Sequence, residues 1–167
     1  MTDFSCHEDI PWIYGGVIGA EGRVMTVIPG ETACLRCLMP DPPTPGSLPT
    51  CDTAGVLGAA VMAVAGIQTS ETIKVLIDPT QYTESRLFAF DLWESTWKTI
   101  DLRVLSEAGC SSCHGDEHKW LDTSRHQTAI LCGQDAVQFH YTNKTPNLCN
   151  IAKNLSYFGS VTENKWL

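Results

Sequence analysis

Residues 33–77 read ACLRCLMPDPPTPGSLPTCDTAGVLGAAVMAVAGIQTSETIKVLI, and three features follow one another in this stretch. A Cys-x-x-Cys pair, Cys34 and Cys37, comes first. A proline-rich loop follows and ends in a lone thiol, Cys51. A long apolar segment then runs to Ile77, and Pro79 prevents a helix from continuing far beyond it. The order predicts a cysteine pair, an irregular loop and a helix.

The apolar segment predicts a helix from about Ala54 to about Ile77. Asp52 or Thr53 can accept a hydrogen bond from the first free backbone N–H groups of that helix. Every residue between Val56 and Ile67 is apolar or glycine. This half of the helix has no polar face and is expected to be buried all round. Polar residues follow too soon for a membrane span, so the pattern is that of a core helix.

Cys51 stands just before the expected start of that helix, where the backbone dipole favours a thiolate. The loop ahead of it holds several prolines and Gly46, which exclude regular structure. A thiol on such a loop is accessible and able to move, which makes Cys51 a candidate nucleophile. The alternative is an ordinary, half-buried cysteine.

The composition describes one domain of ordinary size, or one domain with a small appendage. The chain has 167 residues, and 43% of them are hydrophobic, which is enough for a sizeable core. A formal net charge of −8 argues against a nucleic-acid-binding surface. Nothing at the N-terminus resembles a signal peptide. We therefore expect a cytoplasmic protein without nucleic-acid or membrane partners.

Eight cysteines without a secretion signal indicate metal or thiol chemistry rather than disulfides. Four of them form two Cys-x-x-Cys pairs, Cys34 with Cys37 and Cys110 with Cys113. Zinc takes four thiolates in a tetrahedron, and each short loop presents two of them. The spacing thus predicts a closed, structural zinc site. A redox dithiol and an iron–sulfur cluster are the alternatives, and His114 and His118 are spare ligands that the four cysteines make unnecessary.

Short strands are expected around these motifs, with residues 1–7 ending a helix ahead of them. The predicted strands cover residues 11–18, 23–28, 87–92 and 96–104. Glu21-Gly22 fits a hairpin turn between the first two. Gly15 and Gly16 weaken the first strand and predict that its backbone closely approaches another group.

Residues 116–126 are polar and of mixed charge, which is typical of a solvated linker. Residues 127–167 then predict a small α+β unit, and a core of that size is marginal alone. Its Cys132 and Cys149 are expected to be structural. The predicted elements are strands over 128–132 and 136–141, a helix over 146–158 closed by Gly159, and a last strand over 160–167.

Six motifs follow one another in residues 1–115: Pro11-Trp-Ile-Tyr-Gly-Gly16, Glu21-Gly-Arg-Val24, Cys34-x-x-Cys37, Cys51-Asp-Thr-Ala-Gly-Val-Leu-Gly58, Gln68-x-x-Glu71-x-x-Lys74 and Cys110-x-x-Cys113. In order and spacing they resemble the carboxyl-terminal half of the ThiF/MoeB/HesA family, relatives of ubiquitin-activating enzymes. The resemblance implies an α/β, partial Rossmann-like fold in residues 1–115, with a mixed sheet, a long buried helix and a structural zinc. Residues 127–167 resemble the segment appended to some members.

The resemblance also implies an activity. Family members adenylate the C-terminal Gly-Gly carboxylate of a small ubiquitin-like sulfur carrier with ATP and magnesium, and many then pass sulfur to it through a cysteine. It implies that Cys51 is the active thiol, which attacks the acyl-adenylate or forms an acyl disulfide with a persulfidic sulfur. It further implies that the zinc ligands are Cys34, Cys37, Cys110 and Cys113, and that the protein forms a homodimer.

The nucleotide site of the family lies in its amino-terminal half, and no Gly-x-Gly-x-x-Gly occurs in these 167 residues. We therefore expect a fragment, a split gene product or a truncation that cannot adenylate alone. The strands beside residues 11–28 would then be absent, which predicts an exposed sheet edge and an exposed face on the helix over 56–67. Both features invite a homodimer or a chain that supplies the ATP-binding half.

The alternative function is a non-catalytic, zinc-stabilised interaction module. Such a module would keep the zinc scaffold and the surface that binds a ubiquitin-like carrier or a partner subunit.

Overall fold

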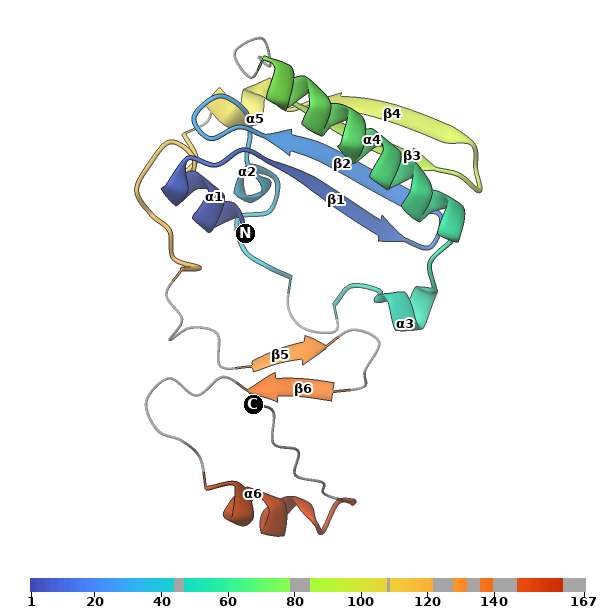
Figure 1. Ribbon diagram of the computed structural model, residues 1–167, viewed down its shortest axis with the longest axis vertical. Coiled ribbons are helices and arrows are strands. Elements are labelled where there is room, and N and C mark those ends of the chain that lie inside the picture. Colours follow the sequence, from blue (N-terminus) through green and yellow to red (C-terminus); the bar gives the residue numbers. More distant parts are fainter. Residues whose placement is uncertain are drawn as a thin grey trace.

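The computed structural model describes residues 1–43, 47–78, 85–107, 109–121, 128–131, 136–139 and 147–160. The helices and strands in these ranges follow one another as shown in Figure 1. In chain order they are α1 (Thr2–Glu8), β1 (Trp12–Ile18), β2 (Glu21–Val27), α2 (Leu35–Leu38), α3 (Cys51–Ala54), α4 (Gly58–Ile77), β3 (Arg86–Asp91), β4 (Thr96–Asp101), α5 (Arg103–Glu107), β5 (Thr128–Leu131), β6 (Ala136–Phe139) and α6 (Leu148–Leu155).

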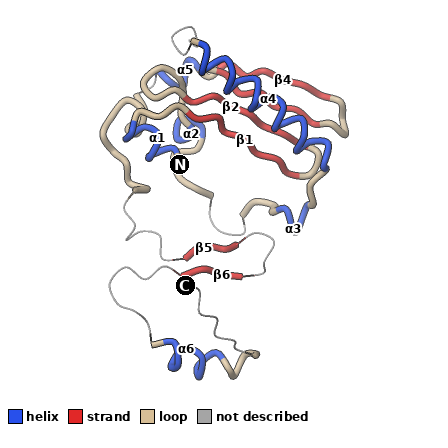
Figure 2. The backbone as a smooth tube through the Cα atoms, viewed as in Figure 1, coloured by secondary structure: helices blue, strands red, loops and turns tan. Residues whose placement is uncertain are grey.

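Four strands form an antiparallel sheet in the order β1-β2-β3-β4, and Figure 2 shows the four strands side by side. The β1–β2 hairpin turns at Gly19, where φ is 56°, and Ile18 already pairs with Glu21. The predicted turn at Glu21-Gly22 is therefore wrong by two residues, because the glycine that tolerates positive φ stands earlier. β1 lies at an edge of this sheet, as the resemblance predicted.

The expected mixed sheet is wrong for the part of the chain that the structure describes. Each described strand pair is antiparallel, because β1–β2 and β3–β4 are joined by short turns that reverse the chain. A single parallel bridge, between Gly19 and Val56, lies outside the strands. With no parallel pair among the described strands, the Rossmann-like part of the prediction stays untested.

The sheet separates two apolar clusters. Successive side chains of a strand point to opposite faces, so Val24 packs under α4 while Met25 packs on the other face. The cluster under α4 consists of Val24, Ala60, Val64 and Phe90. The opposite cluster consists of Met25, Val27, Ala33, Cys34 and Leu102. Cys37, the second cysteine of the first pair, is partly buried against this cluster.

α4 begins later than predicted because residues 55–57 are bound to the β1–β2 turn. The Gly19 N–H donates to the Gly55 carbonyl at 3.0 Å, and the Leu57 N–H donates to the Gly19 carbonyl at 2.8 Å. Gly55 has a φ of 70°, which breaks the helix and leaves α3 as a separate single turn. Thr50 caps α3, and α4 starts at Gly58, so the predicted start at Ala54 with an Asp52 or Thr53 cap is wrong. The predicted end at Ile77 is confirmed.

α4 is buried on one side only. Ala60 and Val64 face the sheet, whereas Met62 is 73% exposed. The prediction of burial all round is wrong because the described residues cover one face of the helix and leave the other uncovered. The exposed face that the family resemblance predicted is present.

By length and composition α4 is apolar enough to cross a membrane, yet its polar residues hold it to the sheet. Gln68 Nε2 donates to the Ile13 carbonyl at 3.1 Å, and Glu71, 2% exposed, accepts from the Thr26 hydroxyl at 3.2 Å. A Cβ on Gly15 would lie 2.5 Å from Gln68 Nε2, which confirms the predicted close approach there. These contacts match a helix packed on a sheet.

Three further predictions are settled towards the C-terminus. β4 ends at Asp101, and α5 replaces the predicted strand end, because the Asp101 carboxylate accepts from the Arg103 N–H at 2.9 Å. β5 and β6 form the predicted hairpin. α6 starts after Asn147, whose side chain accepts from the Asn150 N–H at 3.1 Å, and ends at Leu155 rather than Phe158. The predicted last strand, over 160–167, falls almost wholly outside the described residues, as does Cys132.

Substituting alanine for Gly22, which adds one methyl group, tests the contact between β2 and β3. A Cβ on Gly22 would lie 2.1 Å from Cζ of Phe90, whereas nothing lies within 4 Å of one on Gly66 in α4. Gly22→Ala should lower the free energy of unfolding by about 1–3 kcal/mol through overpacking. Gly66→Ala, the matched control, should raise it by about 0.5–1 kcal/mol through helix propensity. Urea denaturation measures both, and equal midpoints for the two variants would contradict the packing.

Candidate metal centre and reactive thiol

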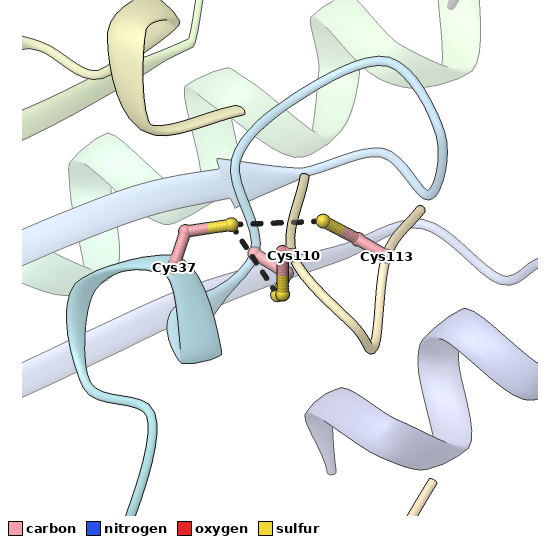
Figure 3. Close-up of side chains that lie close together, drawn as sticks. Cys37, Cys110 and Cys113 are labelled. Atoms are coloured by element: carbon pink, nitrogen blue, oxygen red, sulfur yellow. Dashed lines mark hydrogen bonds between the residues drawn. The ribbon is translucent and has the colours of Figure 1, made fainter. Parts of the chain in front are cut away.

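Two distant segments bring four cysteines into one cage, which we define as Cys34, Cys37, Cys110 and Cys113. The Sγ–Sγ distances are 3.8 Å for Cys34–Cys37, 3.7 Å for Cys34–Cys110 and 3.6 Å for Cys37–Cys113. All four sulfurs lie within 4.8 Å of one another. Figure 3 shows the labelled Cys37, Cys110 and Cys113 pointing toward one another. The structure thus assembles the four residues that the spacing predicted.

The cage fits a single tetrahedral ion. Thiolates bound to zinc at about 2.3 Å form a tetrahedron with edges of about 3.8 Å. A cluster of several irons would place irons and bridging sulfides between the thiolates and spread them further apart. The observed spacing therefore favours one ion, and four thiolates around it leave no position open for a substrate.

Each cysteine pair is presented by a tight turn. Cys34 precedes α2, and the Cys37 N–H donates to the Cys34 carbonyl at 3.0 Å. In the second turn the His114 N–H donates to the Cys110 carbonyl, also at 3.0 Å. Such turns point both sulfurs of a pair the same way. Cys34 is fully buried against the apolar cluster below the sheet, which anchors the cage to the fold.

A buried ion pair joins the two turns, and we call it the Asp3 clamp. Asp3 is 2% and Arg36 9% exposed, and their side chains meet at 3.3 Å. Asp3 also accepts from the Ser112 hydroxyl at 3.0 Å and from the Trp120 N–H at 2.8 Å. Arg36 donates to the Glu117 carbonyl at 2.8 Å. Because Arg36 and Ser112 are inner residues of the two Cys-x-x-Cys turns, the clamp holds both turns to α1.

Sequence reasoning missed this clamp, although one signal was present. Arg36 is a charged residue between two cysteines of a buried turn, and a charge in such a place needs a partner. The partner, Asp3, comes from the first turn of α1, which no local pattern connects to residue 36. Glu117 and Trp120 belong to the predicted linker 116–126, so the first part of that segment is bound to α1 and α2.

Mutual hydrogen bonding sets the protonation of the metal-free cage. The thiols of Cys113, Cys37 and Cys6 surround the Cys34 sulfur and hold the pKa of Cys34 well below its usual range. The same contact with Cys34, followed by that with Cys37 and by burial, raises the pKa of Cys113. One thiolate is therefore favoured before any metal binds, and the remaining cage thiols release their protons on binding.

Two further side chains touch the cage sulfurs. Cys6, one turn after Asp3 on α1, packs against Cys34, and its hydrogen bond to Cys34 and its burial raise the pKa of Cys6. His114 Nδ1 lies 3.1 Å from Cys113 Sγ. The predicted metal site did not include Cys6 and had His114 only as a spare ligand, because neither contact follows from the cysteine spacing.

Cys51 lies outside the cage. It is exposed and is the first residue of the single-turn helix α3. The predicted position at the start of the long helix is wrong, since α4 begins at Gly58, after the break at Gly55. The dipole of a long helix therefore does not act on this thiol. The bound residues 55–57 hold its C-terminal side against the sheet, while its N-terminal side follows the proline-rich loop.

Comparison with known proteins places these features in a family. The defining sequence pattern of the ThiF family matches residues 1–112. The Bacillus subtilis sulfur carrier protein ThiS adenylyltransferase is 34% identical over the whole chain. The SAMP-activating enzyme E1 of Haloferax volcanii is 36% identical over 62% of it, and the Aedes aegypti adenylyltransferase and sulfurtransferase MOCS3 is 33% identical over 62%. The chain spans 49%, 38% and 23% of the lengths of these relatives.

Loss of the Asp3 carboxylate tests the clamp. Asp3→Ala leaves Arg36 buried without its counter-charge and should lower the free energy of unfolding by about 3–5 kcal/mol. Glu21→Ala, which removes the exposed ion pair with Arg23, is the matched control and should cost about 1 kcal/mol or less. Urea denaturation of the two variants makes the comparison, and similar losses would show that the clamp does not hold the turns.

Proposed function

This chain belongs to the ThiF family, and on that basis we propose that it is a component of an adenylyltransferase and sulfurtransferase that activates the C-terminal glycine of a ubiquitin-like sulfur carrier. The names of its relatives support the substrate class. One relative is named for adenylylating ThiS, one for activating SAMP, and one as both an adenylyltransferase and a sulfurtransferase. The observation that carries the proposal is the four-cysteine cage, since three of its cysteines lie in residues 1–112, which match the family, and the fourth, Cys113, follows directly.

We propose that the cage holds one structural zinc ion through Cys34, Cys37, Cys110 and Cys113. The four soft thiolate donors and the edge lengths of the cage support zinc. A bound zinc neutralises the thiolates and contributes folding free energy. The chain's own residues do the positioning, because the two turns tie α1 and the loop after α5 to the buried face of the sheet.

Cys51 is the proposed reactive thiol. Its exposure gives a carrier tail access, and the anchored residues 55–57 keep it near the sheet. The thiolate would attack the carbonyl carbon of the carrier acyl-adenylate, forming a thioester and expelling AMP. Alternatively, a persulfidic sulfur on Cys51 would attack the same carbon and form an acyl disulfide.

ATP and Mg²⁺ are the proposed cosubstrate and ion of the complete activity, bound by residues other than 1–167. A partner chain would carry that nucleotide-binding half, and a homodimer is the other proposed association. The edge strand β1 and the exposed face of α4 support such an association. The cytoplasm is the proposed compartment, because the described cysteines are free thiols.

The second candidate function is a non-catalytic module that uses the zinc-stabilised scaffold to bind a ubiquitin-like carrier or a partner subunit. One observation favours it. Since α3 is a single turn separated from α4, the structure offers Cys51 no long-helix dipole to stabilise a thiolate. Thiol reactivity therefore separates the two functions.

Elemental analysis tests the metal. The purified chain should contain one zinc per chain, with the four cage cysteines protected from alkylation under native conditions. A Cys110→Ser/Cys113→Ser double variant should lose the zinc, because two thiolates cannot replace the tetrahedral set. Cys149→Ser, which removes an exposed thiol on α6, should keep it. A zinc-free protein with all thiols reactive would overturn the structural role of the cage.

Native alkylation tests the thiol. Cys51 and Cys149 are both exposed, so Cys149 is an internal control within the same chain. An active Cys51 should react faster than Cys149 with iodoacetamide near neutral pH, as mass spectrometry of the peptides measures. Equal rates would favour the interaction module.

An assay for adducts between the chain and a sulfur-carrier protein complements the alkylation measurement. With the ATP-binding half supplied, Cys51→Ser should abolish carrier-linked adducts and leave the zinc content unchanged. Adducts that persist in the variant would move the reactive thiol elsewhere, with Cys6 next to be tested.

A further inference from the structure

A shallow hollow of about 850 Å³ lies beside the cysteine cage, and its lining is rich in metal-ligating side chains. Three imidazoles, two thiols and two carboxylates contribute to it, and no lysine or arginine is among the described residues that line it. Imidazole and thiolate donors suit transition metals such as zinc. The ligand-bearing residues are Cys6, His7, Asp9, Cys113, His114, Asp116 and His118.

Two of these imidazoles, those of His7 and His118, each have a ring nitrogen without a hydrogen-bond partner in the described part of the chain. His7 Nδ1 lies 2.9 Å from Glu8 Oε1, a contact that places the ring proton on Nδ1 and leaves the lone pair on Nε2. Carboxylates orient metal-binding histidines in this way. In His118 the Nδ1 atom is buried without a hydrogen-bond partner, so no protein group fixes the tautomer through it.

The spacing of the two rings matches a shared ion. Their centroids are 5.4 Å apart at an interplanar angle of 80°. Two imidazoles bound to one tetrahedral ion at about 2.0–2.1 Å have centroids about 5 Å apart. Only two protein ligands would hold that ion, and water would fill its other positions. Binding there would be weak and reversible.

The hollow leads to the cage. Cys113 is at once a cage ligand and part of the hollow's lining, and His114 Nδ1 touches Cys113 Sγ at 3.1 Å. On the opposite side the cage is closed, since Cys34 is fully buried against Met25 and Leu102. A metal site needs an entry path, and the hollow is one that ends at a cage sulfur.

We propose that His7 and His118 form a second, weak site for a divalent transition-metal ion, and that this site loads the cysteine cage. The inference rests on the proposed metal-binding role of the cage. During transfer the bonds from the metal to the imidazole nitrogens break and bonds to the cage sulfurs form. The cage groups that are still thiols give their protons to water, and both imidazoles are left without the metal.

Cobalt(II) chloride added to the metal-free full-length chain is the test. Thiolate-to-cobalt absorption reports filling of the cage, and a second, weaker equivalent without that absorption reports the histidine site. A hollow lined with ligands raises the local cation concentration, so a His7→Ala/His118→Ala double variant should fill the cage about tenfold more slowly. It should also lose the second equivalent, while the equilibrium affinity of the cage stays unchanged. Glu94→Gln, in the β3–β4 turn outside the hollow, should behave as the unmodified chain.

The outcomes distinguish the two proposals. Absence of thiolate-to-cobalt absorption in the unmodified chain would overturn the cage as a metal centre. Normal absorption that develops equally fast in the double variant would overturn the loading site alone. An affinity loss equal to the rate loss would also overturn it, because a site on the entry path changes binding and release rates equally.

Discussion

Two Cys-x-x-Cys turns meet, one after β2 and one after α5. The positions of α1, α2 and the segment after α5 depend on this contact. No described helix or strand joins these segments, which are held together by the four sulfurs, by the buried Asp3–Arg36 pair and by hydrogen bonds from Arg36 to Ser111 and Glu117. Cys34 ties the cage to the apolar cluster beneath the sheet, and Asp3 ties it to α1. Breaking either link would free α1, α2 and the segment up to Trp120 together.

The cage and the clamp act in different states of the chain. The cage becomes a set of four thiolates only when a cation binds and the remaining thiols release their protons, so the cage is most stable when filled. The Asp3–Arg36 pair is neutral overall and is satisfied by Ser112, Trp120 and Glu117 without any metal. It can therefore hold the turns in position while the cage is empty. An open cage of this kind is what a loading site beside it requires.

On the other face of the sheet, α4 packs over the strands. One side of α4 is buried against the sheet, and its opposite side is exposed. Its polar residues Gln68 and Glu71 face β1 and β2, while Met62 and other apolar side chains face outward. The bridge from Gly19 to Val56 fixes where this helix starts and, with it, where Cys51 is held. The apolar outer face of α4 and the position of β1 at the edge of the described sheet are the features on which the proposed association with another chain rests.

By itself the sequence determined the type of most elements, the four cysteines of the cage and the family, because periodicity, cysteine spacing and motif order are local or simply ordered along the chain. It did not determine the Asp3 clamp, the contact of Cys6 with the cage or the His7–His118 pair, since each joins residues far apart in the chain. His114 contacts the adjacent Cys113, and only the folded turn decides how these two side chains are oriented. The start of α4 was also decided by tertiary structure. The apolar pattern alone predicted a continuous helix through Gly55, whereas Gly55 has a φ of 70° and the residues on either side of Val56 are hydrogen-bonded to Gly19. Tertiary structure also decided which side of α4 is buried. An apolar sequence pattern shows that a helix face can be covered, but only the neighbouring elements in the fold determine which face they cover.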